Sequence, residues 1–141
     1  MEERIREHVR RASLDGQVKL VGYVSDLPAA MSALDIALYV PLESDGMGRV
    51  LFECLALGRP LVASRVGVVS EVLGDGREAL LVPAGDPGLL AEAIRRLVAD
   101  PGLRTALGLA GRRLVVERYS GACVAARLAD LYAGLLARQA S

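Results

Sequence analysis

The sequence predicts an α/β fold: a Rossmann-like parallel sheet with crossover helices, followed by a helical C-terminus. Short apolar runs alternate with helix-like segments through the first part of the chain, and this alternation is typical of strands joined by crossover helices. The runs lack polar alternation, as expected of strands buried on both faces. A length of 141 residues suits one domain, so we expect a single domain over 1–141.

The N-terminal segment 1–13 carries Ile5, Val9 and Ala12 at helical spacing among charged residues, which predicts an exposed amphipathic helix. The predicted strands are QVKLVG at 17–22, DIALYV at 35–40, PLVAS at 60–64 and ALLV at 79–82. Between these strands we expect helices at 26–34, 47–57 and 69–73.

Three further helices are predicted after the last strand. Asp86-Pro87 is a helix N-cap followed by the residue best tolerated at the first helical position. The two helices after it are expected at 101–117 and 120–138. We expect one face of the last helix to point toward the core, with Val124, Leu128, Leu131, Tyr132 and Leu135.

Composition excludes several classes of function. The 17 basic residues balance the 17 acidic ones, so no basic surface for nucleic acid is expected. Apolar runs end well before the roughly 20 residues of a membrane span, and we therefore expect a cytoplasmic protein without one. Cys54, Cys123 and His8 lack the spacing of a metal site, so both cysteines are expected to be small buried hydrophobes.

Open parallel sheets bind their ligands beyond the carboxyl ends of the strands, so the loops after Val40, Ser64 and Val82 are candidates. The first loop carries Gly46 and Gly48 between a strand and a helix. Bare glycine backbone lets a ligand approach closely and aims N–H groups at an anion such as a phosphate. On its own, such a glycine pair is as often structural as functional.

Two carboxylates, Asp45 and Glu53, bracket this first loop. Glu53 falls within the first two turns of the following helix, on the side expected to face the strand ends. A carboxylate there can accept hydrogen bonds from vicinal hydroxyls, as acidic residues do for ribose in dinucleotide-binding folds.

The second loop places Gly67 after a strand and before a predicted helix, with Ser70 and Glu71 near the helix start. A ligand-binding role and a structural role both suit these residues. In the structural role, Ser70 or Glu71 caps a short helix and stabilises it by about 1 kcal/mol.

Taken together, these segments resemble the C-terminal, nucleotide-sugar-binding domain of retaining glycosyltransferases of the two-domain GT-B architecture, in the group 1 or glycogen-synthase-like family. The resemblance runs over 18–119. The matching motifs, in chain order, are an apolar strand ending in glycine (18–22), a strand ending in proline (35–41), a glycine loop between two acids (45–53), a run into the next strand (53–64), a glycine loop ending in glutamate (67–71) and an Asp-Gly turn before the last strand (75–82).

The resemblance implies that a nucleotide diphosphate-sugar lies at the strand ends. An acceptor held by another domain would attack it with retention at the anomeric carbon. Glu53 would hold the ribose hydroxyls, and Asp45, the catalytic candidate, would contact the donor sugar. The implied donor-binding set is Gly46, Met47, Gly48, Arg49, Val50, Glu53, Gly67 and Glu71. The nucleotide-sugar is a substrate, and the resemblance implies no metal and no other cofactor.

Three positions depart from the family pattern. Asp45 stands where the family usually has Glu, one methylene longer, and Ala79 stands where it has glycine. Val68 replaces the second glycine of a Gly-Gly pair. Because valine avoids positive φ and carries a branched side chain, Val68 is expected to crowd the donor pocket.

The family also has an Arg and a Lys upstream of the matching segments that neutralise the leaving diphosphate. We therefore expect a truncated domain, inactive alone, that works with an N-terminal acceptor-binding domain or with another chain. The alternative is a non-catalytic nucleotide-binding or structural module of a split or truncated enzyme. A doubly wound signalling domain of the response-regulator kind would need an acidic cluster at its first strand end, and the sequence lacks one.

The family's strand order bears on association. In the order third-second-first-fourth-fifth-sixth, the strand at 17–22 is third and the strand at 35–40 is fourth, so two strands would lie between them. Unpaired buried N–H and C=O groups on facing edges cost free energy. Either the segment 17–22 moves beside 35–40, or the open edges recruit another chain and give a homo-oligomer.

Overall fold

The computed structural model describes residues 2–43, 46 and 48–139. Its centre is a three-stranded parallel sheet in the order β1-β2-β3, made of β1 (Ala37–Tyr39), β2 (Leu61–Ser64) and β3 (Leu80–Val82). The helices are α1 (Glu2–Arg11), α2 (Leu27–Ser32), α3 (Arg49–Ala56), α4 (Val68–Val72), α5 (Pro87–Ala99), α6 (Pro101–Arg118) and α7 (Gly121–Gln139). The predicted α/β class with a parallel sheet and a helical C-terminus is confirmed.

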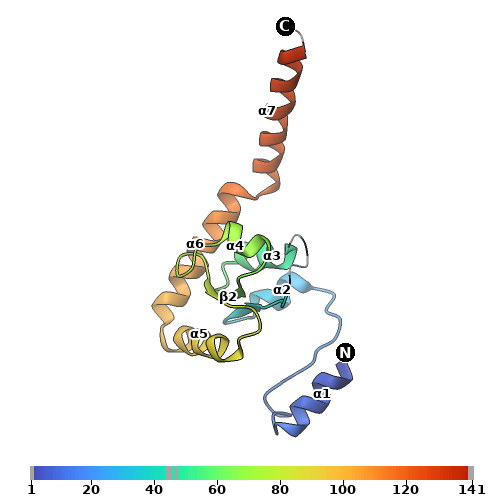
Figure 1. The fold of residues 1–141 in the computed structure, drawn as a ribbon, viewed down its shortest axis with the longest axis vertical. Coiled ribbons are helices and arrows are strands. Elements are labelled where there is room, and N and C mark those ends of the chain that lie inside the picture. Colours follow the sequence, from blue (N-terminus) through green and yellow to red (C-terminus); the bar gives the residue numbers. More distant parts are fainter. Residues whose placement is uncertain (1, 44–45, 47, 140–141) are drawn as a thin grey trace.

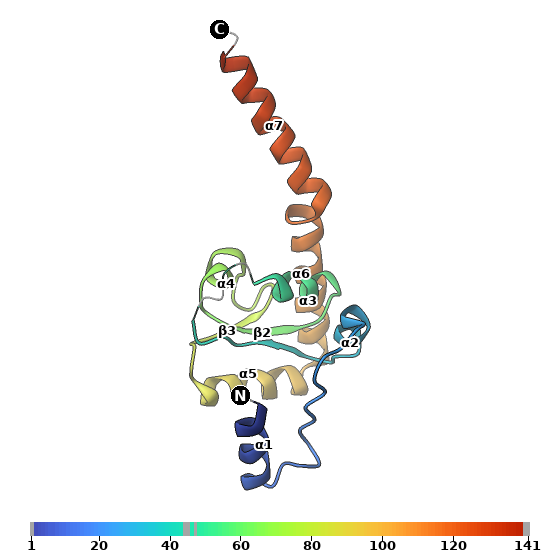
Figure 2. The ribbon, with the colours of Figure 1, turned by 90° about the vertical axis from the view of Figure 1, so that its right-hand side faces the viewer.

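The sheet lies between two helical layers, with α3, α4 and α6 on one side and α5 on the other (Figure 2). Alternate strand residues face opposite layers, as the pleat requires. Leu61, Ala63 and Leu81 join the core cluster beneath α3 and α4, whereas Val62 and Leu80 join the cluster against α5. Burial on both faces explains why the strands read as unbroken apolar runs.

Three helices begin at an aspartate that is followed within two residues by proline. The side chains of Asp26, Asp86 and Asp100 accept hydrogen bonds from the backbone N–H of the residue three positions on, at 3.0, 2.9 and 2.8 Å. Each carboxylate thereby satisfies a helix-end donor that has no partner within the helix. These local signals explain why the starts of α2, α5 and α6 were predictable.

Helix α6 packs closely on α3 through two buried glycines. A Cβ atom on Gly108 would lie 2.3 Å from the carbonyl oxygen of Gly58, and one on Gly111 would lie 2.5 Å from Leu55 Cδ2. Any side chain at Gly108 would therefore collide with backbone. This approach fixes α3, and with it the loop that precedes α3, against the C-terminal part of the domain.

The predicted strand at 17–22 is wrong. Residues 18–24 form no strand, and the segment runs from α1 toward α2 outside the sheet (Figure 1). Val21 is 73% exposed and Tyr23 is 94% exposed. Within the described residues β1 pairs with β2 alone. The segment therefore has not moved beside β1, and one edge of β1 has no strand partner in the part of the chain described.

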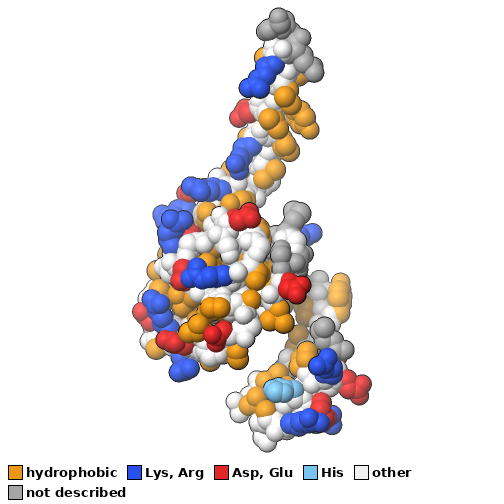
Figure 3. Space-filling model, viewed as in Figure 1, with side chains coloured by type: hydrophobic (Ala, Val, Ile, Leu, Met, Phe, Trp, Pro, Cys, Tyr) orange, Lys and Arg blue, Asp and Glu red, His pale blue; other side chains and the backbone are white. Residues whose placement is uncertain are grey.

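The expectation that the last helix packs on the core is also wrong. Helix α7 projects away from the body of the domain (Figure 1). Hydrophobic side chains gather along one side of it (Figure 3). The face expected to be buried is between 44% and 62% exposed, at Val124, Leu128, Leu131, Tyr132 and Leu135.

The stretch Pro101–Arg138 is long and apolar enough to cross a membrane, by length and composition alone. In the fold it comprises two helices, α6 and α7, which a turn at Tyr119 and Ser120 separates. Helix α6 buries Leu107 and Val115 in the domain core. The apolar window within this stretch is not buried, and the apolar residues of α7 are exposed.

Candidate functional site

The carboxyl ends of β1 and β2 are joined by a side chain. The Ser64 hydroxyl donates a 2.6 Å hydrogen bond to the carbonyl oxygen of Pro41, the second residue after β1. Ser64 is itself almost fully buried. This bond holds the start of the first glycine loop beside the end of β2, so the two candidate loops leave the sheet side by side.

The first loop reaches α3 through glycines at positive φ. Gly46 has a φ of 94° and Gly48 a φ of 54°, backbone conformations that L side chains rarely adopt. Gly48 is the N-cap of α3 and has no side chain with which to cap it. Asp45 and Met47 lie outside the described residues, so their roles stay predictions.

Arg49 and Val50 form the first turn of α3, where both side chains are exposed. Glu53 lies one turn further and is partly exposed. The Arg49 Nε atom donates a 2.8 Å hydrogen bond to Glu53 Oε1. The first turn of α3, predicted to face the phosphates, and Glu53, predicted to bind the ribose, thus lie on the same surface of this helix.

The second loop turns into α4 at Gly67, whose φ of 48° and ψ of −133° are open to glycine and almost no other residue. Val68 begins α4 and is half-buried, whereas Ser70 and Glu71 are exposed on the helix. No side-chain cap bonds the start of α4, so neither Ser70 nor Glu71 plays the capping role considered for it.

The two glycine loops touch each other. A Cβ atom on Gly48 would lie 3.0 Å from Val68 Cγ1 and 3.3 Å from the Tyr39 hydroxyl oxygen. Val68 therefore packs directly on bare backbone at the start of α3. The structure brings together Gly48, Arg49, Glu53 and Gly67 from the predicted set, because α3 and α4 both begin at the same end of the sheet.

Cys54 follows Glu53 and is buried against the sheet. Burial raises the pKa of the Cys54 thiol, and the neighbouring Glu53 carboxylate raises it further. The prediction that both cysteines are buried holds for Cys54 only. Cys123, at the junction of α6 and α7, is partly exposed, and its Sγ lies 3.3 Å from the carbonyl oxygen of Glu117. Within the described ranges, no three or more His, Cys, Asp or Glu side chains gather into a group that could hold a metal ion.

Sequence reasoning missed a set of polar side chains that fixes the loops around β3. Asp75 accepts a 2.9 Å hydrogen bond from the Leu81 N–H and forms a 2.6 Å ion pair with Arg65, just after β2. Glu78 is buried and accepts bonds from the Gly74 N–H at 2.8 Å and from Arg77 Nε at 2.6 Å. The Asp-Gly turn was the available signal, and its aspartate proves to hold two loops together.

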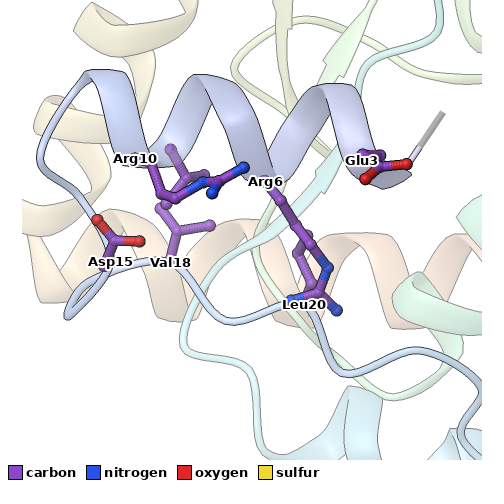
Figure 4. Close-up of a pocket in the computed structure, with 7 residues that line it drawn as sticks. Glu3, Arg6, Arg10, Asp15, Val18 and Leu20 are labelled. Atoms are coloured by element: carbon purple, nitrogen blue, oxygen red, sulfur yellow. The ribbon is translucent and has the colours of Figure 1, made fainter.

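Two cavities deserve comparison with the predicted site. A cavity of about 190 Å³ lies at the ends of all three strands, with Val40, Ser64 and Val82 among its lining residues. Another, of about 370 Å³, lies between α1 and the segment after it and is lined by Arg6, Arg10 and other residues (Figure 4). That second cavity contains no residue of the predicted site, whereas the first adjoins the loop after β1.

Solved structures identify the class to which this fold belongs. HepE of Anabaena, crystallised with UDP, superposes with a TM-score of 0.89 and 22% identity over 94% of this chain and 36% of that protein. A sucrose-phosphate synthase of Thermosynechococcus elongatus superposes with a TM-score of 0.81 and 32% identity, over 96% of this chain and 34% of that protein. The C-terminal domain of LpcC, a group 1 glycosyltransferase of Francisella tularensis, superposes with a TM-score of 0.77 and 25% identity, over 85% of this chain and 63% of that domain. The fold is that of a GT-B glycosyltransferase.

The family follows from sequence. The family model "Glycosyl transferases group 1" matches residues 1–100, and the chain belongs to that family. A phosphatidyl-myo-inositol mannosyltransferase of Mycobacterium leprae is 34% identical over 133 residues, which are 93% of this chain and 35% of that protein. A D-inositol 3-phosphate glycosyltransferase of Streptomyces bingchenggensis is 38% identical over 96 residues, which are 68% of this chain and 21% of that protein. The chain thus spans about a third or less of the length of these relatives.

Proposed function

We propose that this chain binds the nucleotide diphosphate-sugar donor of a retaining glycosyltransferase that transfers a hexosyl group to an acceptor. The observation that carries the proposal is the meeting of two glycine loops at the strand ends, with Glu53 one turn along α3. These residues lie inside the part of the chain that matches the family. HepE is a structural neighbour crystallised with UDP-glucose, which supports the same kind of ligand.

Each part of the proposed site suits one part of such a donor. The Glu53 carboxylate would accept hydrogen bonds from the ribose hydroxyls. The N–H groups at the start of α3, from Gly48 to Val50, together with the helix dipole, would meet the negative diphosphate or the sugar next to it. Asp45 would contact the hexosyl group, and Gly67 and Glu71 would complete the donor side of the site. The donor is a substrate, and the proposal requires no metal or other cofactor.

The proposed reaction breaks the bond between the anomeric carbon and the diphosphate oxygen. A bond to an acceptor oxygen forms on the same face of the sugar, the proton of the acceptor hydroxyl passes to the leaving diphosphate or to solvent, and the nucleoside diphosphate leaves with the electron pair of the broken bond. An acceptor-binding part, N-terminal on a longer chain or supplied by another chain, belongs to this proposal. The relatives are about three times as long as this chain, which leaves room for such a part.

A second candidate function is a non-catalytic nucleotide-binding or structural module of a split or truncated enzyme. The same observation about length favours it, because a chain that spans about a third of its relatives' length matches only part of a complete transferase. In either case we propose a cytoplasmic protein that binds no nucleic acid, in keeping with its balanced charge.

Calorimetric titration of the 141-residue chain with UDP, UDP-glucose, GDP and GDP-mannose tests donor binding. We expect one nucleotide pair to bind with measurable heat, and the absence of binding for all four would refute the proposal. Incubation with the bound donor and analysis for free hexose separates the two candidates. The module predicts no turnover of the donor, whereas hydrolysis or transfer by the purified chain would show that the chain is catalytic and would exclude the module.

A further inference from the structure

The contact between Val68 and Gly48 closes the space between the two glycine loops. Gly48 is buried, and Val68 Cγ1 lies 3.0 Å from the place where a Cβ atom of Gly48 would stand. The Tyr39 hydroxyl oxygen lies 3.3 Å from the same place. Side chains from the end of β1 and the start of α4 thus meet over bare backbone at the start of α3.

Val68 is held firmly in this position. It follows Gly67, whose backbone conformation is restricted to glycine, and it is the first residue of α4. Its side chain packs against the core cluster, as does that of Tyr39. A β-branched side chain has few χ1 rotamers, so Val68 does not swing aside at little cost.

The chemistry of this gap depends on residue 68. With glycine at position 68, two bare backbones would face each other, with room and polar groups for a sugar hydroxyl. Valine puts methyl groups there, and a polar ligand group placed against them loses its hydrogen bonds to water without replacement. The gap is therefore both narrower and less polar than a pair of glycine loops provides.

The direction of α3 indicates which part of a donor meets Val68. Glu53, the proposed ribose ligand, lies five residues after Gly48, about 7.5 Å along the helix at 1.5 Å per residue. A donor held at Glu53 by its ribose extends its diphosphate toward the start of α3. The sugar end then lies nearest to Gly48 and Val68.

We infer that Val68 is a specificity-determining residue, whose side chain restricts the space for the hexosyl group while leaving the nucleoside diphosphate unaffected. This inference rests on the proposed function and concerns one residue of the same site. It predicts that shortening Val68 strengthens the binding of a nucleotide-sugar without strengthening the binding of the nucleotide itself.

The test compares wild type, Val68→Ala and Val68→Gly by calorimetry with UDP and UDP-glucose, and with GDP and GDP-mannose. We expect both variants to bind the preferred nucleotide-sugar about five times more tightly or better, which corresponds to about 1 kcal/mol. The affinity for the matching nucleoside diphosphate should change less than about twofold. Val68→Ala keeps helix-forming backbone in α4, so the test does not depend on the glycine variant.

Val72→Ala is the matched control, because Val72 lies one turn further on α4 and also packs on the core cluster. It should change neither affinity. Equal tightening of the nucleotide and the nucleotide-sugar, or no tightening in either Val68 variant, would overturn the inference and leave the proposed function standing. Failure of wild type and all variants to bind any of the four probes would overturn the proposed function, and the inference with it.

Discussion

Arg49 and Glu53 form an ion pair one turn apart on α3, with 2.8 Å between Arg49 Nε and Glu53 Oε1. The Arg49 side chain is 87% exposed and that of Glu53 is 34% exposed, so the pair stabilises the fold little. A cation at a helix N-terminus also opposes the helix dipole. In the proposed function, the pair would also orient the Glu53 carboxylate and put a positive charge where the diphosphate would lie.

Glu53 is predicted to dominate nucleotide binding. A hydrogen bond to a charged group is worth about 1.5–3 kcal/mol, so Glu53→Ala should weaken the binding of UDP or GDP by more than about tenfold. Calorimetry with wild type and variant measures this directly. Equal affinities would show that Glu53 does not contact the ribose.

Arg49 is predicted to act on the phosphates alone. Arg49→Gln removes the positive charge at the start of α3 and should weaken UDP binding several-fold while leaving the binding of uridine unchanged. Ligand-observed NMR with both ligands checks this, and Glu53→Ala serves as the contrasting variant because it should weaken both. A similar loss for uridine in Arg49→Gln would mean that the change disturbs Glu53 instead.

Substitution by alanine is predicted to destabilise the fold at Gly108 and to stabilise helix α7 at Gly134. A Cβ atom on Gly108 would lie 2.3 Å from the Gly58 carbonyl oxygen, whereas one on Gly134 would meet nothing within 4 Å. Gly108→Ala should lower the free energy of unfolding by about 1–3 kcal/mol. Gly134→Ala should raise the helicity of α7, because glycine disfavours helix by about 1 kcal/mol. Thermal unfolding and circular dichroism test both, and a neutral Gly108→Ala would contradict the close packing of α6 on α3.

The stability of the fold is predicted to fall at alkaline pH because of the Cys54 thiol. Burial, and then the Glu53 charge, raise the pKa of the Cys54 thiol above its ordinary value of 9.0. The unfolded chain therefore releases this proton at a lower pH than the folded chain does. The thiol's contribution to stability is present below about pH 9 and is lost as the pH rises through the folded pKa. Urea unfolding should show a steeper loss between neutral and alkaline pH for wild type than for Cys54→Ala, and parallel curves would contradict this.

The chain is predicted to associate with itself through the open edge of β1. Ala37 N–H donates to the Pro60 carbonyl oxygen at 2.9 Å, so the alternation of a strand directs the N–H and C=O of Leu38 to the other side. That edge can pair with another chain. Sedimentation velocity should show oligomers that increase with concentration, and Leu38→Pro should reduce them because proline removes a donor at the free edge.

Leu131→Lys provides the control for this prediction, since it interrupts the apolar face of α7 and leaves β1 intact. We expect it to have a smaller effect than Leu38→Pro. A wild-type chain that stays monomeric at all concentrations would contradict the prediction, as would oligomers that Leu131→Lys alone abolishes.

The features that could be predicted from sequence are those whose causes are local. Asp86-Pro87 begins a helix because the carboxylate and the proline act on the next few residues. The apolar run 60–64 gives a strand because helices cover both faces of β2. The run 17–22, which contains Gln17 and Lys19, was also predicted to be a strand, but a strand requires a neighbour, and residue pattern does not reveal whether one is present.

The same limit applies at the site. The glycines of the two loops were identifiable because special backbone conformations demand glycine. The contact of Val68 with Gly48 joins residues 20 positions apart, and it depends on how α4 packs against α3. The Arg65–Asp75 ion pair likewise depends on two loops meeting after different strands. The sequence pattern identified the residue types at the site. Which of them are in contact depends on how the helices and loops pack.

Because α7 projects away from the domain, its local stability is expected to differ from that of the packed sheet and its helices. A solitary helix of fewer than roughly 12–15 residues is marginal in water, and α7, with 19 residues, lies not far above that limit and gains little from packing. Its amide protons are therefore predicted to exchange with solvent through opening of the helix itself, whereas those of β2 await unfolding of the whole domain. Covering the apolar face of α7 would slow its exchange first. The exchange rate of this one helix would thus report whether that face is occupied, independently of whether the nucleotide site is filled.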